Sequence, residues 1–222
     1  MRIIILSIFS FFFSLHVMSQ VAVSKEPRHH PVFENDKVRI LNVLVPAGDT
    51  TQYHVHSTPS VFIMFTKTLT GSQRVNEPPQ YSTSVPGTLW YEDLSEPHIK
   101  IHRVWNLDTS VFHVMDIELL SKEASFIINL QPIAHAHLQI DTPWAAVYKV
   151  HISNNENLSI RDIPSDFVLV AINEAEIKAV ENNKETTSFI KPGQYYWINA
   201  NDKFSLVNLG SGSADFALIS IR

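Results

Sequence analysis

Short apolar runs rich in Val, Ile, Phe and Tyr recur along the whole chain, and turn-forming residues separate them. The runs cover 38–45, 61–65, 99–104, 111–119, 145–152, 167–172, 195–198, 204–209 and 216–221. Gly, Pro, Asn, Asp and Ser cluster between them. Short strands at regular spacing with turns between them are typical of sandwiches and barrels. The pattern therefore predicts an all-β protein, and residues 171–182, which could be written as a helix, are read as strand because of their Val and Ile content.

The pattern repeats. When the two halves of the chain are aligned with an offset of 107 residues, residues 46–48 match 153–155 and residues 61–63 match 168–170. Further on, Pro86-Gly87 matches Pro192-Gly193 and Asn106-Leu107 matches Asn208-Leu209, with an offset that small loop deletions shorten. We predict two similar β domains, residues 20–130 and 143–222, joined by a linker at 131–142. A chance alignment of two all-β stretches is the alternative.

The first 19 residues have the pattern of a secretory signal. Arg2 precedes a short apolar run, and small residues follow before Gln20. The run is shorter than the roughly 20 residues that span a bilayer. We predict cleavage near Ser19, a secreted or periplasmic protein, and no stable membrane insertion after the signal is removed; an uncleaved N-terminal anchor is the alternative.

Composition narrows the class of partner. The formal charge of −5 becomes −6 once Arg2 is removed, and no basic run is present, so nucleic acid is not expected as a partner. The chain has no cysteine, so buried apolar area has to stabilise the fold without disulfides. Few charges protect the predicted strand edges, which makes a homodimer possible.

The candidate chemistry centres on His54 and His56. Two histidines at i and i+2 point to the same side only on a β-strand, where both imidazoles can reach one metal ion. No other catalytic signature competes with this pair: the chain has no thiol, no Gly-x-Ser-x-Gly elbow, no phosphate loop and no dinucleotide fingerprint.

Two motifs resemble those of the cupin superfamily of small β-barrels. Gly48 and the His54/His56 pair match the spacing of the first motif, and Pro97, His102 and Asn106 match the second, with Ile99 where glycine is usual. The resemblance covers about residues 32–120, and 143–222 more weakly. It implies two tandem barrels of the jelly-roll type, a bicupin, with one divalent metal ion held by His54, His56 and His102.

The sequence departs from the family at the glutamate of the first motif, which falls on Ser60 or Val61. Three neutral imidazoles remain, a set that suits Fe, Zn, Mn, Ni or Cu and leaves open positions for water or substrate. Such a site favours an anionic ligand. The missing carboxylate also leaves a vestigial, metal-free site as the alternative.

The second half lacks all three proposed ligands. At the same offsets, His54 falls on Arg161, His56 on Ile163 and His102 on Phe204. We therefore expect the metal site in the first half and a degenerate second barrel.

Strand alternation extends the site to a pocket. Counting every second residue from His54 reaches Ser60, Phe62 and Met64, and His98, Lys100 and Asn106 share parity with His102. We predict that these six residues line the pocket, although Phe62 and Met64 can also be plain core. The other histidines are not expected in the main site: His113 is read as core or surface, His135 and His137 as linker, and His29 and His30 as a polar lead-in.

The sequence thus predicts an exported metal-binding bicupin that acts on or binds a small anionic or oxygen-rich metabolite. A dioxygenase and a sugar-acid isomerase or lyase both fit the resemblance. A non-catalytic ligand-binding or structural protein is the competing class.

Overall fold

The computed structural model describes residues 20–121, 133–161 and 164–222. The predicted signal at 1–19 and part of the predicted linker lie outside them. The first half contains one short 3₁₀ turn, η1 (Val23–Lys25). Its strands are β1 (Val21–Ala22), β2 (His29–Glu34), β3 (Val38–Val45), β4 (His54–His56), β5 (Ser60–Met64), β6 (Leu69–Arg74), β7 (Gln80–Thr83), β8 (Leu89–Glu92), β9 (Lys100–Asn106) and β10 (Phe112–Leu119).

The second half is built from strands alone in its described residues. They are β11 (Ala136–Asp141), β12 (Ala145–Ile152), β13 (Asn157–Ile160), β14 (Phe167–Ala171), β15 (Ala175–Glu181), β16 (Lys184–Ile190), β17 (Tyr195–Ile198), β18 (Phe204–Asn208) and β19 (Ala214–Ile221). The all-β prediction is confirmed. In the described ranges no helix is long and apolar enough to cross a bilayer.

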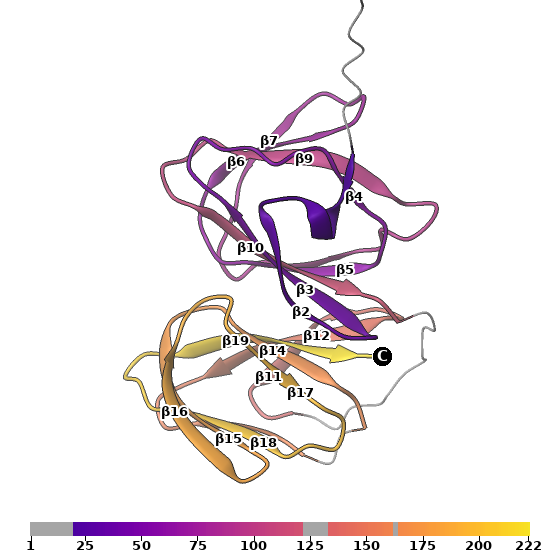
Figure 1. The fold of residues 1–222 in the computed structure, drawn as a ribbon. Helices are drawn as coiled ribbons and strands as arrows, with labels where there is room; N and C mark the ends of the chain where they lie inside the picture. The colour runs from indigo at the N-terminus through magenta and orange to yellow at the C-terminus, as the bar shows by residue number, and fades with distance from the viewer. Residues whose placement is uncertain (1–19, 122–132, 162–163) are drawn as a thin grey trace, which may run out of the picture.

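Each half forms a barrel from two facing sheets (Figure 1). The first barrel has the strand orders β1-β4-β9-β6-β7 and β2-β3-β10-β5-β8, and the second has β11-β12-β19-β14-β17 and β13-β18-β15-β16. The central strand triplets correspond, since β3-β10-β5 of the first barrel matches β12-β19-β14 of the second. The predicted tandem-barrel architecture is therefore confirmed.

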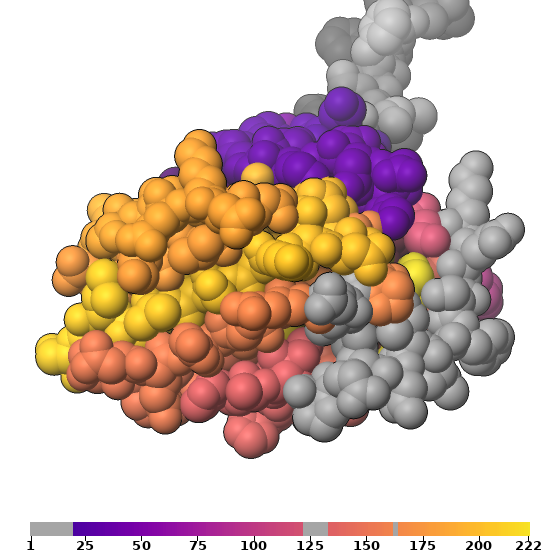
Figure 2. All heavy atoms as spheres, turned by 90° about the horizontal axis from the view of Figure 1, so that it is seen from below, coloured from indigo at the N-terminus to yellow at the C-terminus, as the bar shows by residue number. Residues whose placement is uncertain are grey.

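Strand alternation divides β10 between two cores. Phe112 and Val114 belong to the apolar cluster inside the first barrel. Met115 and Ile117 point the other way, into a cluster shared with Val168 and Ile219 of the second barrel. The two barrels thus pack sheet against sheet (Figure 1), and seen from below the orange and yellow second barrel lies directly against the indigo N-terminal strands (Figure 2).

This packing bears on the predicted homodimer. The broad apolar face of the first barrel is covered by the second barrel of the same chain. A homodimer would have to use another surface, and it stays a prediction.

The predicted linker, 131–142, contains a strand. Residues 136–141 form β11, which pairs antiparallel with β12 at the edge of the second barrel. His137 is exposed on this strand, and His135 precedes it with its Nδ1 3.7 Å from an oxygen of Glu156. Residues 136–141 are thus an edge strand of the second barrel and not part of a linker.

Two asparagines at matching positions hold matching turns. The Asn106 side-chain amide donates to the carbonyl oxygens of Val45 and Ser110, at 2.9 and 2.7 Å. Asn208 donates in the same way to Ile152 and Gly212, at 3.0 and 2.7 Å. Both side chains are buried. Asn106, predicted to line the pocket, is therefore a structural residue that the degenerate barrel keeps.

Strand register corrects one expected match. His54 lies opposite His102 on β9, and the residue opposite Phe204 on β18 is Ile160, not Arg161. The first barrel has one extra residue here. Thr50 bridges Trp105 and His54 pairs with His102, so the four residues 51–54 oppose the three residues 102–104. The second barrel pairs without that irregularity. Such bulges re-aim side chains near functional sites, and this one precedes His54.

Replacing Asn106 or Asn208 with Ala should destabilise the protein by about 1–3 kcal/mol each, because two buried carbonyl oxygens lose their donors in either case. Urea unfolding monitored by circular dichroism measures the change. The Asn106→Ala protein should bind metal like the wild type; lost metal binding with unchanged stability would show that Asn106 belongs to the site.

Candidate metal centre

Two adjacent strands bring the three motif histidines together. β4 carries His54 and His56 on the inner face of the barrel, and β9 places His102 directly opposite His54. All three side chains are buried. The His102 ring centroid lies 4.6 Å from that of His54 and 5.1 Å from that of His56. The structure thus gathers the three residues that the motif spacing predicted.

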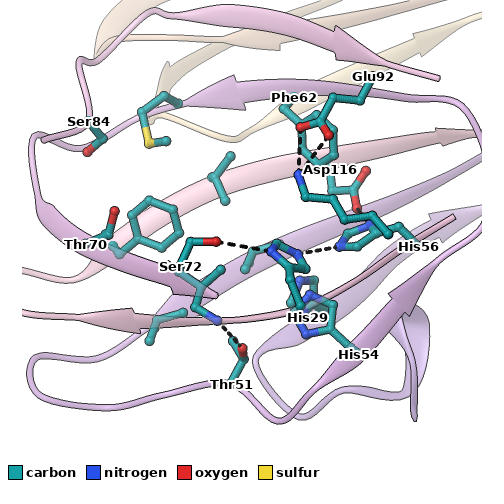
Figure 3. Close-up of a pocket in the computed structure, with 18 of the residues that line it drawn as sticks. His29, Thr51, His54, His56, Phe62, Thr70, Ser72, Ser84, Glu92 and Asp116 are labelled. Carbon is teal, nitrogen blue, oxygen red and sulfur yellow. Dashed lines mark hydrogen bonds and ion pairs between the residues drawn. The ribbon is translucent and has the colours of Figure 1, made fainter. Parts of the chain in front are cut away.

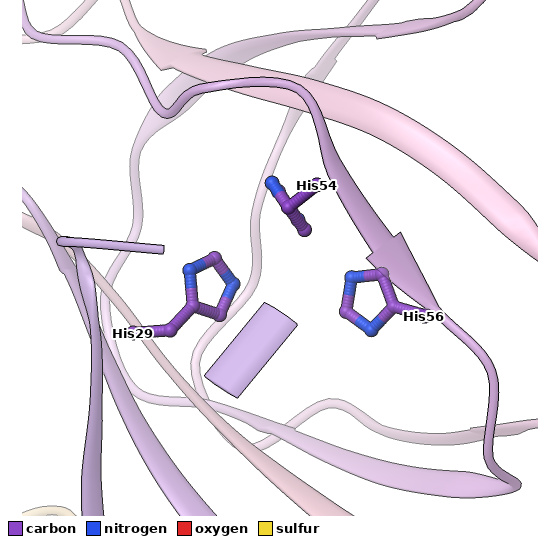
Figure 4. A group of neighbouring side chains, drawn as sticks. All are labelled: His29, His54 and His56. Atoms are coloured by element: carbon purple, nitrogen blue, oxygen red, sulfur yellow. The ribbon is translucent and has the colours of Figure 1, made fainter. Parts of the chain in front are cut away.

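A fourth imidazole joins them from β2. The His29 ring centroid is 4.5 Å from that of His54, and one ligand atom from each of His29, His54 and His56 lies within 4.8 Å of the others. Figure 4 shows the three rings turned toward one another. The expectation that His29 lies outside the main site was wrong: it is the buried first residue of the edge strand β2 and belongs to the histidine cluster. No local spacing links it to the His54/His56 pair.

A buried carboxylate fixes the tautomer of His29. The Nδ1 of His29 lies 2.7 Å from an oxygen of Glu26, which also accepts hydrogen bonds from the backbone amides of Arg28 and Gln52. Burial alone would raise the pKa of Glu26, but these hydrogen bonds outweigh it and hold the pKa below its ordinary value. The ionised carboxylate accepts a hydrogen bond from the Nδ1–H of His29, so the Nε2 lone pair of this ring is left free.

A backbone carbonyl does the same for His54. Its Nδ1 donates to the Gln52 carbonyl oxygen at 2.9 Å, within the bulge. Its Nε2 is buried and has no hydrogen-bond partner among the described residues. A buried nitrogen with a free lone pair is costly unless a cation or a donor meets it.

The inner nitrogens of the remaining two imidazoles face each other. The Nε2 atoms of His56 and His102 are 3.1 Å apart, so a proton on one of them or a shared cation has to separate the two lone pairs. The Nδ1 of His102 is 3.4 Å from the Ser72 hydroxyl, and that of His56 is 3.4 Å from Asp116 Oδ2.

Burial favours the neutral form of His54 and His102. It lowers the pKa of His54 to about 3, with repulsion from His29 and His56 as a further cause, and it lowers that of His102 well below its ordinary value. Imidazoles bind metals in their neutral form. Neutral rings, outer hydrogen-bond partners and an unpartnered inner nitrogen together fit a divalent metal ion.

A cavity of about 290 Å³ opens beside the histidines (Figure 3). Val43, Val45, Phe62, Met64, Phe112 and Val114 form its apolar wall. Thr70, Ser72, Ser82 and Ser84 line it with polar groups. Phe62 stacks on Trp90 with a centroid distance of 4.8 Å and an interplanar angle of 13°. The cavity thus offers a flat aromatic surface beside a polar metal-binding end.

The predicted pocket residues separate into two groups. Phe62, Met64 and Lys100 line the cavity. Ser60 is buried with its hydroxyl 3.3 Å from the Thr58 carbonyl oxygen, and His98 is exposed; neither borders the cavity, and nor does Asn106. The prediction that His98 shares a strand face with His102 was wrong, because His98 lies in the turn before β9.

Lys100 is paired with a neighbour on the cavity wall. Its Nζ donates to both oxygens of Glu92 at 2.9 and 2.8 Å, and Trp90 Nε1 donates to the same carboxylate at 3.2 Å. Burial would raise the pKa of Glu92, but the Lys100 ammonium holds it below its ordinary value. An entering anion therefore meets a lysine that already has a partner.

Two carboxylates near the cluster escaped sequence reasoning. Glu26 stands behind His29 and Asp116 stands behind His56. Glu26 directly follows η1 and Asp116 lies on β10, while the motif position at Ser60 and Val61 stays without an acid. The charge of a bound cation is thus offset from the outer shell, which weakens the inference that an anionic ligand has to supply all of the compensation.

Comparisons place the fold among known structures. No protein-family model and no curated protein matches the chain. Solved structures do match. AerE from Microcystis aeruginosa has a TM-score of 0.60 and 9% identity, over 89% of this chain and 98% of that one.

Two further structures extend the likeness. A cupin 2 conserved barrel domain protein from Leptotrichia buccalis has a TM-score of 0.56 and 12% identity, over 92% and 100% of the two chains. Salicylate 1,2-dioxygenase from Pseudaminobacter salicylatoxidans has a TM-score of 0.58 and 10% identity, over 84% and 71%. The chain thus shares its fold with these proteins, and its two β-barrels in one polypeptide are similar to cupin barrels.

Proposed function

We propose that the chain is an exported metal-dependent cupin that binds a small carboxylated or phenolic compound and catalyses its reaction with dioxygen. The observation that carries the metal site is the unpartnered, buried Nε2 of His54 among three further buried imidazoles. The fold shared with a salicylate dioxygenase supports the class of reaction.

The shape of the cavity supports the class of ligand. At roughly 30 Å³ for each water molecule, 290 Å³ holds about ten waters, which is the size of a single-ring acid. The Phe62–Trp90 stack would pack against a flat ring, and the hydroxyls of Thr70 and Ser72 would face its polar groups. A sugar acid would leave hydroxyls unpaired against the apolar wall, which disfavours an isomerase or lyase.

The bound metal would act as a Lewis acid that holds the ligand oxygens and, if it is iron, activates dioxygen. The ligand atoms of His29, His54 and His56 lie within 4.8 Å of one another and would hold it, and His102, opposite His54, is placed to add a fourth nitrogen. Glu26 and the Gln52 carbonyl keep two of these rings in the binding tautomer. The apolar wall excludes water from the side where the ligand ring would lie.

Replacing His54 with Ala should abolish stoichiometric metal binding, because it removes the imidazole whose inner nitrogen has no other partner. Elemental analysis of protein purified without chelators and without oxygen measures the loss, and circular dichroism checks the fold. His98→Ala is the matched control, since His98 is exposed and should keep the wild-type metal content. Equal metal in both variants would contradict the site.

The iron-loaded protein should consume dioxygen when supplied with gentisate or salicylate, with both oxygen atoms found in the product. An oxygen electrode and mass spectrometry with ¹⁸O₂ measure this. Phe62→Ala should raise KM, because the flat surface for the ring is lost. Slow turnover of a uronic acid by the zinc- or manganese-loaded protein, without oxygen uptake, would favour the isomerase or lyase class instead.

Export predicts a mature chain that begins at Gln20. β1 starts at Val21 and pairs with β4 at His54, so cleavage there would leave the metal site intact. Mass spectrometry of the protein recovered from its host should give this terminus. A chain that retains Met1 in the cytoplasm would contradict export and leave the chemistry of the site untouched.

A further inference from the structure

Asp116 is a buried carboxylate without an evident structural role. It lies on the inner face of β10, is 1% exposed and borders the metal-site cavity. Neither of its oxygens has a hydrogen-bond partner among the described residues. The nearest basic group is His56, whose Nδ1 is 3.4 Å from Oδ2, close enough for an ion pair but outside hydrogen-bond geometry. An unpaired carboxylate in such a place opposes folding.

The second barrel shows that the fold does not need an acid at this position. Asp116 pairs with Leu41 on β3 and Phe62 on β5. Leu218 takes the same place on β19, between Tyr148 on β12 and Leu169 on β14. Leu218 is fully buried in the core of the second barrel. The acid therefore accompanies the histidines, which the second barrel also lacks.

The other imidazoles each have an outer partner. The Nδ1 of His29 faces the Glu26 carboxylate, and the Nδ1 of His54 faces the Gln52 carbonyl oxygen. The Nδ1 of His102 faces the Ser72 hydroxyl. His56 is left with Asp116 alone. Metal-bound histidines almost always donate their second N–H to a carboxylate, a carbonyl or water, which fixes the ring and strengthens the ligand.

We propose that Asp116 is the positioning residue of His56: in the metal-bound protein it accepts a hydrogen bond from the Nδ1–H of this ring, turns Nε2 toward the metal and offsets part of the cation's charge. The inference rests on the proposed metal site. It assigns a role that opposes the stability of the metal-free fold, as functional groups often do. Glu118, the nearest other acid on the same face of β10, is already engaged by Arg39 and Thr58 at 2.8 and 2.9 Å.

The test measures stability and metal affinity separately. Asp116→Leu copies the second barrel, and Asp116→Asn keeps an acceptor oxygen without the charge. In both variants the urea midpoint of the metal-free protein should stay equal to that of the wild type or rise. The affinity for Co²⁺ and Zn²⁺, measured by competition with a chelator, should fall about 10- to 100-fold, more in Asp116→Leu than in Asp116→Asn.

Glu118→Gln is the matched control, because it should lower stability and leave metal affinity unchanged. Wild-type Co²⁺ affinity in both Asp116 variants would overturn the inference while leaving the metal site standing. So would a metal-free Asp116→Asn protein less stable than the wild type with unchanged affinity. A wild-type protein that binds neither metal would overturn the proposed function itself, and this role of Asp116 with it.

Discussion

The burial of four imidazoles inside one small barrel is the constraint on which the rest of the site depends. A neutral imidazole has one N–H that needs a hydrogen-bond acceptor and one nitrogen lone pair that needs a hydrogen-bond donor or a cation. The barrel supplies the acceptors from separate places: a carboxylate beside η1, a carbonyl in the bulge before β4, a hydroxyl on β6 and an acid on β10. A bound cation would satisfy the inner lone pairs. Metal binding would therefore offset the cost of burying these rings.

The second barrel works as an internal comparison. It keeps what the fold requires, including the turn asparagine Asn208 with its two carbonyl partners. At the positions of His54, His102 and Asp116 it has Ile160, Phe204 and Leu218, all buried and apolar. A barrel of this shape therefore fills its interior with side chains when it holds no site. The fold therefore does not require the buried polar groups of the first barrel.

The second barrel also covers the outer face of one sheet of the first barrel. One sheet of the first barrel is buried on both faces, by its own cavity wall and by the sheet of the second barrel. That packing holds β10 and β5 rigid, and these strands carry Asp116, Phe62 and Met64. A site on rigid strands keeps its geometry better than one on loops. The degenerate barrel thus supports the site without contributing a ligand to it.

The sequence by itself determined the strands, the duplication and the three motif histidines, because these depend on local spacing and alternation. Period-two patterns decide which residues face inward, and His54 and His56 share a face for that reason alone. Only the tertiary structure decided the roles of His29, Glu26 and Asp116, since their partners lie on strands that are distant in the chain and no spacing rule connects them. The same is true of Asn106, whose parity suggested the pocket but whose amide meets two carbonyl groups across the turn. Contacts between distant strands are set by sheet order and register, which local patterns do not encode.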